Sequence, residues 1–159
     1  LFVDFYQTSL ADDEILTHVV VPPLPAGSGV EYIRFSSSSV VDKPCVGVSV
    51  RLSLDAKTKG SRVVRVVLGC VGATPVRARK AEALLAGKTI TPELAVEAGA
   101  LASQECSPTS DLRGSAEYKR AIVKTLVKRA STKAYERALT LPSPSGRGLG
   151  KDEEETKIG

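Results

Sequence analysis

Residues 46–54 alternate between two kinds of side chain along their whole length. The apolar ones share one side: Val46, Val48, Val50, Leu52 and Leu54. The residues between them are glycine, serine and arginine. Successive side chains of a β-strand point to opposite faces, so this period of two predicts a strand with one buried and one more polar face.

Three other segments have the composition of strands. Residues 62–68 are rich in β-branched side chains and follow a short turn rich in Lys and Gly, which predicts a hairpin with residues 46–54. Residues 30–35 alternate in polarity and predict a short strand. Residues 14–21 are also β-branched, and a pair of prolines ends them, which a central strand does not tolerate.

The pattern changes to that of helices after residue 75. Residues 78–86 are rich in Ala, Leu and Glu, and they stop at Gly87, a residue type that commonly ends helices. A second helix is predicted to begin after Thr91, which can cap it, with Pro92 in its first position. It should end near Cys106, before a Ser-Pro pair.

A third helix is predicted after Ser115, which can cap it. Apolar side chains then recur every four residues, which indicates one buried face. The predicted apolar face consists of Tyr118, Ile122, Val123, Leu126, Val127 and Ala130. Strands first and helices second favour an α+β fold, with a small antiparallel sheet of three to four strands covered on one face by three helices.

The predicted domain spans residues 14–135, and residues 1–13 precede it. Residues 136–159 include prolines, glycines and the acidic run 152–155 without an apolar period, so they are predicted to be a disordered tail. The chain contains no methionine, which indicates that it is a piece of a longer polypeptide.

Composition argues against several functions. The net charge of +4 is spread over several segments, and the four Tyr and three Phe leave few rings on which bases could stack, which disfavours nucleic-acid binding. The three cysteines form no CxxC pair, so this chain alone should build neither a zinc nor an iron–sulfur site. Free thiols, with no membrane span or signal peptide, favour the cytoplasm.

Candidate chemical groups are few, and no catalytic motif is present. His18 lies in an apolar run and is interpreted as a strand residue. The glycines of residues 27–29 and 69–72 could admit a phosphate, but a role in turns is favoured. Asp111 and Arg113 are interpreted as a structural pair that fixes a loop. These residues predict neither a catalytic group nor a metal ligand.

Four groups of segments carry a resemblance to a known family. They are residues 8–22; residues 32–35 with Asp42 and 46–48; residues 69–77 with Glu82 and 85–87; and residues 110–120 with 126–130. Over about residues 1–135, their order and spacing resemble the C-terminal domain of the FAD-binding (medium) subunit of molybdenum hydroxylases, the family of carbon monoxide dehydrogenase and xanthine dehydrogenase.

The resemblance implies a part of a multi-subunit oxidoreductase that is inactive as a fragment. FAD would be bound mainly by an upstream domain, of which residues 1–13 would be the end. The implied partners are a large subunit with the molybdenum cofactor and a small subunit with 2Fe-2S clusters, which pass electrons through FAD to an acceptor. Carbon monoxide, aldehydes, purines and aromatic acyl thioesters all remain open as substrates, because the molybdenum subunit selects them.

The resemblance also suggests three cofactor-binding residues. Tyr32 would close one face of the flavin, Arg34 would favour the anionic reduced flavin or the phosphates, and Asp42 would order the nearby loop. Residues 36–39 are serines where the family often has basic residues. One alternative is an assembly module that makes no cofactor contact, with Tyr32 as an ordinary core tyrosine; another is a free-standing binding domain unrelated to flavin.

Overall fold

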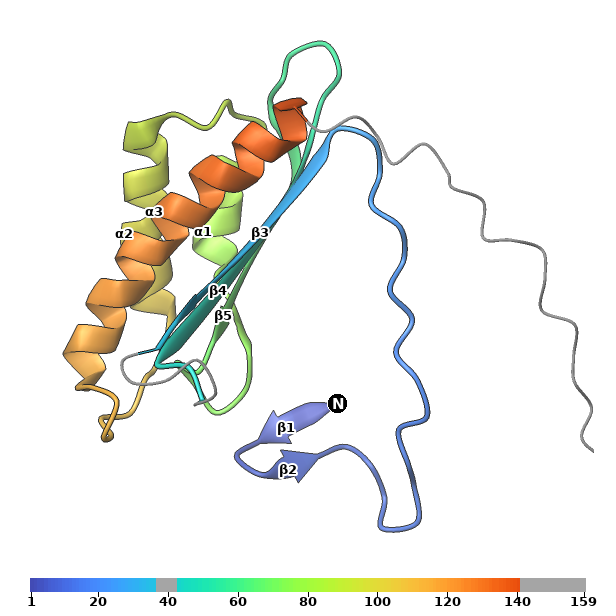
Figure 1. Ribbon diagram of the computed structural model, residues 1–159, viewed down its shortest axis with the longest axis vertical. Coiled ribbons are helices and arrows are strands. Elements are labelled where there is room, and N and C mark those ends of the chain that lie inside the picture. Colours follow the sequence, from blue (N-terminus) through green and yellow to red (C-terminus); the bar gives the residue numbers. More distant parts are fainter. Residues whose placement is uncertain (37–42, 141–159) are drawn as a thin grey trace, which may run out of the picture.

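A four-stranded antiparallel sheet with strand order β3-β4-β5-β6 forms the centre of the fold (Figure 1). The strands are Ser28–Phe35 (β3), Val46–Leu54 (β4), Ser61–Gly69 (β5) and Val76–Arg77 (β6). The computed structural model describes residues 1–36 and 43–140. The predicted hairpin is confirmed, because β4 and β5 pair along nearly their whole length.

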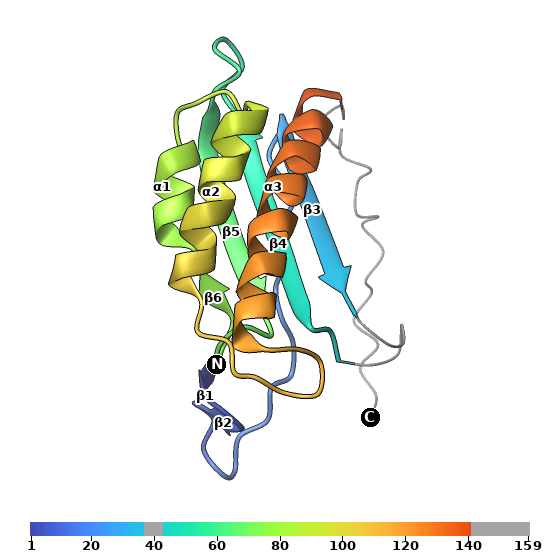
Figure 2. The same cartoon turned by 90° about the vertical axis from the view of Figure 1, so that its left-hand side faces the viewer.

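Three helices lie side by side on one face of this sheet (Figures 1 and 2). They are Arg79–Leu85 (α1), Pro92–Glu105 (α2) and Ala116–Thr140 (α3). The α+β prediction is therefore confirmed, with the strands before the helices. The third helix continues to Thr140, beyond the predicted domain end at residue 135.

The core fills the space between the sheet and the helices. The apolar side chains of β4 face the helices as predicted, and Val46, Val48, Val50 and Leu52 are fully buried. The helices contribute mainly small residues, among them Ala98, Ala102, Ala130 and Ala134. Small side chains let helix backbones approach the sheet closely, which compensates for the scarcity of aromatic residues.

The predicted helix signals act as expected. The Thr91 side chain accepts a hydrogen bond from the Leu94 N–H at 3.2 Å, and the Ser115 side chain accepts one from the Tyr118 N–H at 3.1 Å. Gly87 follows α1 with a φ of +76°, a conformation that glycine adopts without steric cost.

The strand expected at residues 14–21 is absent. This segment lies exposed without strand pairing, as part of the long blue connection in Figure 1. A small hairpin of Phe2–Asp4 (β1) and Gln7–Thr8 (β2) precedes it. The interpretation of His18 as a strand residue is therefore wrong: its Nδ1 lies 2.9 Å from the exposed Thr17 hydroxyl. β-branched composition cannot make a strand where no partner edge is available.

The predicted apolar face of α3 is confirmed for Val123, Leu126, Val127 and Ala130, which are buried. Tyr118 departs from it with 45% exposure, and its neighbour Lys119 is buried instead. The buried stripe then continues through Ala134 to Ala138. The exchange at Tyr118 has a tertiary cause, because the aliphatic stem of a lysine can pack inside when its ammonium finds partners. None of the helices described is long and apolar enough to cross a membrane.

Candidate functional site: the helix-free face of the sheet

The second face of the sheet carries no helix (Figure 1). Residues directly opposite in an antiparallel pair share a face, and the register places polar and basic residues on this one. Its larger side chains are Tyr32, Arg34, Arg51 and Arg65, with the apolar Val30, Val63 and Val67 among them. No acidic side chain of strands β3 to β6 accompanies them, because Glu31 is paired with Val50 and faces α3. The face is therefore basic and has one exposed aromatic ring.

Tyr32 lies on this face with one side supported. It pairs with Ser49, and its ring lies against Gly47. A methyl group placed on Gly47 would come within 3.1 Å of the Tyr32 hydroxyl, so the ring uses the space that glycine leaves. The residue remains 58% exposed. Tyr32 is thus not an ordinary core tyrosine in this chain, because much of its surface is open to solvent.

Arg34 follows on the same face of β3, where it pairs with Gly47 and is half-buried. The structure thus brings Tyr32 and Arg34 together on the face that the helices leave free. Asp42, the third predicted site residue, lies outside the described residues. The cofactor roles of all three remain predictions.

The glycines of residues 27–29 do not form a phosphate loop. Gly29 lies directly beneath the backbone of α3, and the Ser28 hydroxyl is hydrogen-bonded to the buried Ser53 hydroxyl at 2.7 Å. The role of Gly29 is therefore to permit a close helix–sheet contact. The turn role favoured from the sequence is confirmed at Gly27, whose φ is +66°, whereas Gly29 serves packing.

The loop before α3 is fixed by a different ion pair from the one expected. The Asp111 carboxylate lies 2.8 Å from the buried Lys119 ammonium, which also donates to the Thr109 carbonyl at 2.8 Å. The Arg113 guanidinium donates instead to the Lys43 carbonyl, and only the main-chain N–H of Arg113 contacts Asp111. The loop is structural, as predicted, but Lys119 is the partner of Asp111.

Replacing Asp111 with asparagine is expected to lower the thermal midpoint at neutral pH. The hydrogen bond from Lys119 and the N–H of Arg113 hold the pKa of Asp111 below its usual value. A depressed pKa stabilises the fold above the unfolded carboxyl pKa, and this stability is lost as the pH falls through the folded value. The difference from wild type should therefore shrink in acid. Calorimetry checks this, with exposed Asp13→Asn as control; a constant difference would contradict it.

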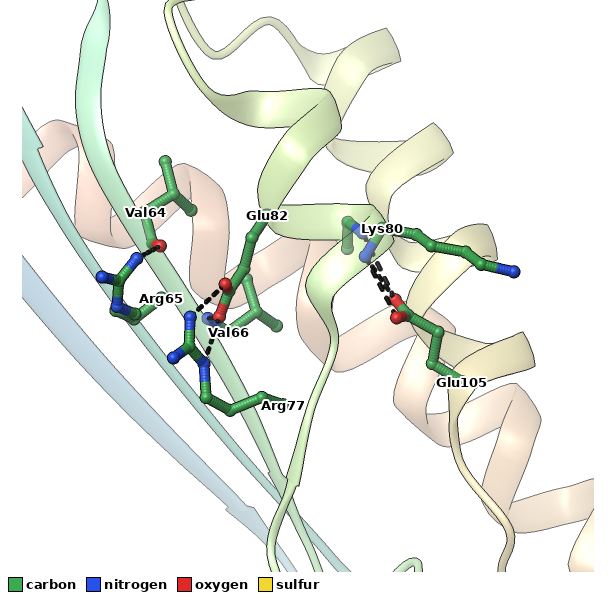
Figure 3. A network of polar contacts seen from close by, with 8 residues as sticks. Val64, Arg65, Val66, Arg77, Lys80, Glu82 and Glu105 are labelled. Atoms are coloured by element: carbon green, nitrogen blue, oxygen red, sulfur yellow. Dashed lines mark hydrogen bonds and ion pairs between the residues drawn. The ribbon is translucent and has the colours of Figure 1, made fainter.

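Glu82 has a structural role that was not predicted from the sequence. Its carboxylate accepts a hydrogen bond from the Val66 N–H at 2.9 Å and from Arg77 Nε at 3.0 Å, and it forms an ion pair with Arg77 (Figure 3). It thereby satisfies a strand donor just beyond the short β6. A signal was present, because Glu82 lies between the apolar Ala81 and Leu85 on α1.

The three cysteines form no disulfide, although Cys45 and Cys70 line the same small pocket. Cys45 and Cys106 are buried, and burial raises the pKa of both thiols. Cys45 donates to the Arg113 carbonyl, with 3.4 Å between the sulfur and the oxygen. Within residues 1–36 and 43–140, no group of three or more His, Cys, Asp or Glu side chains could hold a metal ion.

These features define a class of protein: a small α+β domain whose antiparallel sheet is covered by helices on one face and is basic on the other. The family model described as "CO dehydrogenase flavoprotein C-terminal domain" matches residues 31–134. The chain therefore belongs to this family, the C-terminal domain of the FAD-binding medium subunit of molybdenum hydroxylases.

Known proteins of this kind resemble the chain over most of its length. The nicotine 6-hydroxylase medium subunit of Paenarthrobacter nicotinovorans is 38% identical over 137 residues, which are 84% of this chain and 46% of that protein. The carbon monoxide dehydrogenase medium chain of Hydrogenophaga pseudoflava is 31% identical over 136 residues, 86% of this chain and 46% of the relative.

A solved structure agrees with these sequence matches. The structure of carbon monoxide dehydrogenase from Hydrogenophaga pseudoflava, which lacks the Mo-pyranopterin moiety of its cofactor, superposes with a TM-score of 0.79 at 34% identity. The match covers 86% of this chain and 46% of the solved one. The chain thus spans about half the length of the relatives it matches.

Proposed function

We propose that this chain is the part of a molybdenum hydroxylase flavoprotein that covers one side of the FAD ring system. The observation that carries the proposal is the exposed Tyr32 beside Arg34 on the helix-free face of the sheet. FAD would be bound mainly by a part of the flavoprotein outside this chain. When bound, it supplies an isoalloxazine that accepts and releases electrons.

The residues present fit this role. Tyr32 rests against Gly47 on one side, so its exposed side can close one face of a planar ring and exclude water from it. A nearby guanidinium favours the negatively charged form of a group, so Arg34 would stabilise the anionic reduced ring or a phosphate. The helix-free face has room for this contact because no secondary-structure element in residues 1–36 and 43–140 packs on it.

The exposed apolar side chains of the N-terminal segment support a contact between this segment and another part of the protein. Ile15, Val19, Val20 and Val21 are between 72% and 82% exposed, although all four are apolar. A contiguous exposed apolar segment of this kind marks a contact surface. In the proposed assembly, residues 1–21 pack against the flavin-binding part of the protein and hold the helix-free face next to it.

The proposed complex is an oxidoreductase. A large subunit would carry the molybdenum cofactor and a small subunit the 2Fe-2S clusters, with electrons passing through FAD to an acceptor. The names of the relatives support this composition, since they are medium subunits or chains of such enzymes. Buried free thiols support a reducing compartment, and we place the complex in the cytoplasm. This chain contributes no substrate-selecting residue to the proposal.

Tyr32→Ala in the intact flavoprotein is expected to change the flavin environment. Loss of the ring admits water to one flavin face, so flavin fluorescence should rise and the reduction potential should shift. Tyr32→Phe keeps the ring and should retain most of the wild-type spectrum. Tyr118→Ala is the matched control, because Tyr118 is also exposed but belongs to α3.

The same experiment separates the proposal from a purely structural role. An assembly module without cofactor contact would leave the flavin spectrum and potential of Tyr32→Ala unchanged while altering the yield of the purified complex. Equal changes in the Tyr32→Ala and Tyr118→Ala proteins would also count against the flavin contact, because they would indicate a general loss of folding.

A further inference from the structure

A groove lies along the outer edge of β5, between this strand and α1. Its volume is about 490 Å³, within the range of sites that bind ligands or peptide side chains. The apolar part of its lining is formed by Val63, Val64, Ala83 and Ala86. Its charged lining consists of four arginines and one glutamate: Arg62, Arg65, Arg77, Arg79 and Glu82. We call it the arginine groove.

Positive charge exceeds negative charge in the lining of the arginine groove, which holds four arginines and one glutamate. Glu82 is hydrogen-bonded to Arg77 and the Val66 N–H (Figure 3), and the charge of Arg65 also acts on it. The Arg65 guanidinium donates to the carbonyl of its neighbour Val64, at 2.9 Å. Arg62 and Arg79 are exposed, and Arg62 is close enough to Asp55 for its charge to act on that carboxyl. These guanidinium groups therefore have donors available for an incoming anion.

A further arginine of the sheet, Arg51, adds to this excess. Arg51 is paired directly with Arg65 across β4 and β5, and like charges in that position destabilise a sheet. The Nε of Arg51 is buried and has no hydrogen-bond partner among the described residues. An anion near this pair would relieve the repulsion between the two guanidinium groups.

One main-chain donor of β5, at Val64, is also left unpaired by the described residues at this place. The Val66 N–H donates to the Glu82 carboxylate, and the Val66 carbonyl accepts a hydrogen bond from the Ala78 N–H. The Ser61 N–H donates to the Lys88 carbonyl, and the Ser61 carbonyl accepts from the Gly87 N–H. Main-chain groups alternate between the two edges of a strand, so Val64 points to the same edge as Val66. Its N–H meets no acceptor in the described part of the chain, which leaves one unpaired donor inside the groove.

We infer that the arginine groove binds an extended acidic segment of another polypeptide. The segment pairs its main chain with Val64, and its Asp or Glu side chains meet Arg62, Arg65 and Arg79. Main-chain hydrogen bonds to a strand are an established way to hold extended peptides, and Val64 supplies one such donor. All four cations of the groove are arginines, whose planar guanidinium binds carboxylates with two parallel hydrogen bonds.

The position of the groove argues for a segment from outside this chain. The strand order places β5 and β6 at one edge of the sheet and β3 at the other. Helix α3 ends beside β3, where Arg137 donates to the Val30 carbonyl at 2.6 Å. The last helix of the described chain therefore ends at the edge opposite to the groove.

The test uses the intact flavoprotein and a fluorescent synthetic peptide in which Glu and Val alternate. Fluorescence anisotropy should show saturable binding that weakens as salt is added. The double variant Arg62→Ala, Arg79→Ala should bind about tenfold more weakly, because it loses two charge-assisted contacts. The matched control Lys124→Ala, Lys128→Ala removes the same charge from exposed positions of α3 and should bind like wild type.

Other outcomes would overturn the inference. Absence of saturable peptide binding, or equal weakening in both double variants, would show that only net charge matters. A peptide methylated at its central amide nitrogens that binds as tightly as the parent would rule out pairing with β5. Displacement of the peptide by an equal concentration of inorganic pyrophosphate would identify a site for small oxyanions. None of these readouts depends on the flavin contact of Tyr32.

Discussion

Replacing Gly29 with alanine is expected to destabilise the domain by about 3 kcal/mol, the upper end of the usual cost of overpacking. The added methyl group would lie 1.9 Å from the Ala134 carbonyl oxygen and 2.7 Å from the Ala138 amide nitrogen. Both atoms belong to the backbone of α3, which cannot move aside like a side chain. Either α3 must shift away from β3 or the strand must bend.

Replacing Gly99 in α2 with alanine provides a related test, because helix propensity and helix packing predict opposite changes in stability. By helix propensity alone, alanine would stabilise the exposed interior of a helix by about 1 kcal/mol relative to glycine. Here the methyl group would lie 2.3 Å from the Lys124 carbonyl oxygen of α3. We therefore expect Gly99→Ala to destabilise, because the α2–α3 contact outweighs propensity.

Urea unfolding at neutral pH measures both glycine substitutions. Glu97→Ala is the matched control, because Glu97 lies on the exposed side of the same helix. The control should stay within about 0.5 kcal/mol of wild type, as exposed substitutions usually do. A stabilising Gly99→Ala substitution, or a neutral Gly29→Ala, would show that α3 packs less closely than described.

Glu82→Ala should cost about 2 to 3 kcal/mol at neutral pH, because it leaves the buried Val66 N–H without an acceptor. Arg77 also loses its ion-pair partner. Glu82→Gln keeps an oxygen acceptor and should cost less. Chemical unfolding of the two variants separates the two contributions, with Glu97→Ala again as the exposed control.

The contribution of Glu82 should depend on pH. Burial raises the pKa of this carboxyl, but the hydrogen bonds from Arg77 and from the Val66 N–H lower it by more. The pKa of Glu82 therefore lies below its usual value. The stabilisation is therefore complete above the unfolded glutamate pKa of about 4.3 and is lost as the pH falls through the folded value. The cost of Glu82→Gln should shrink in acid; a cost that grows there would contradict the assignment.

Local patterns in the sequence determined the elements whose signals lie within a few residues of each other. The alternation in residues 46–54 predicted β4 and which of its side chains are buried, because every second side chain must be buried in a half-covered sheet. Thr91 and Ser115 predicted the starts of α2 and α3, because a cap contacts only the first turn. The quoted segments, including residues 69–77 and 110–120, also sufficed to recognise the family.

The candidate site could also be predicted in part from local sequence patterns. The alternation that placed Val46 and Val48 toward the helices leaves Gly47 on the opposite face. The short strand prediction for residues 30–35 then allows Tyr32 and Arg34 to share a face. That the Tyr32 ring lies against Gly47 follows only from how the strands pair.

Only the tertiary structure decided the contacts between residues distant in sequence. Residues 14–21 have strand composition but no pairing edge, and composition cannot supply one. Lys119 is buried although lysine is usually exposed, because Asp111 and Thr109 meet its ammonium. Glu82 accepts a hydrogen bond from the Val66 N–H of β5 because the tertiary fold places α1 beside that strand. Each of these outcomes depends on residues that are far apart in sequence and that only folding brings into contact. Local sequence patterns do not specify such contacts.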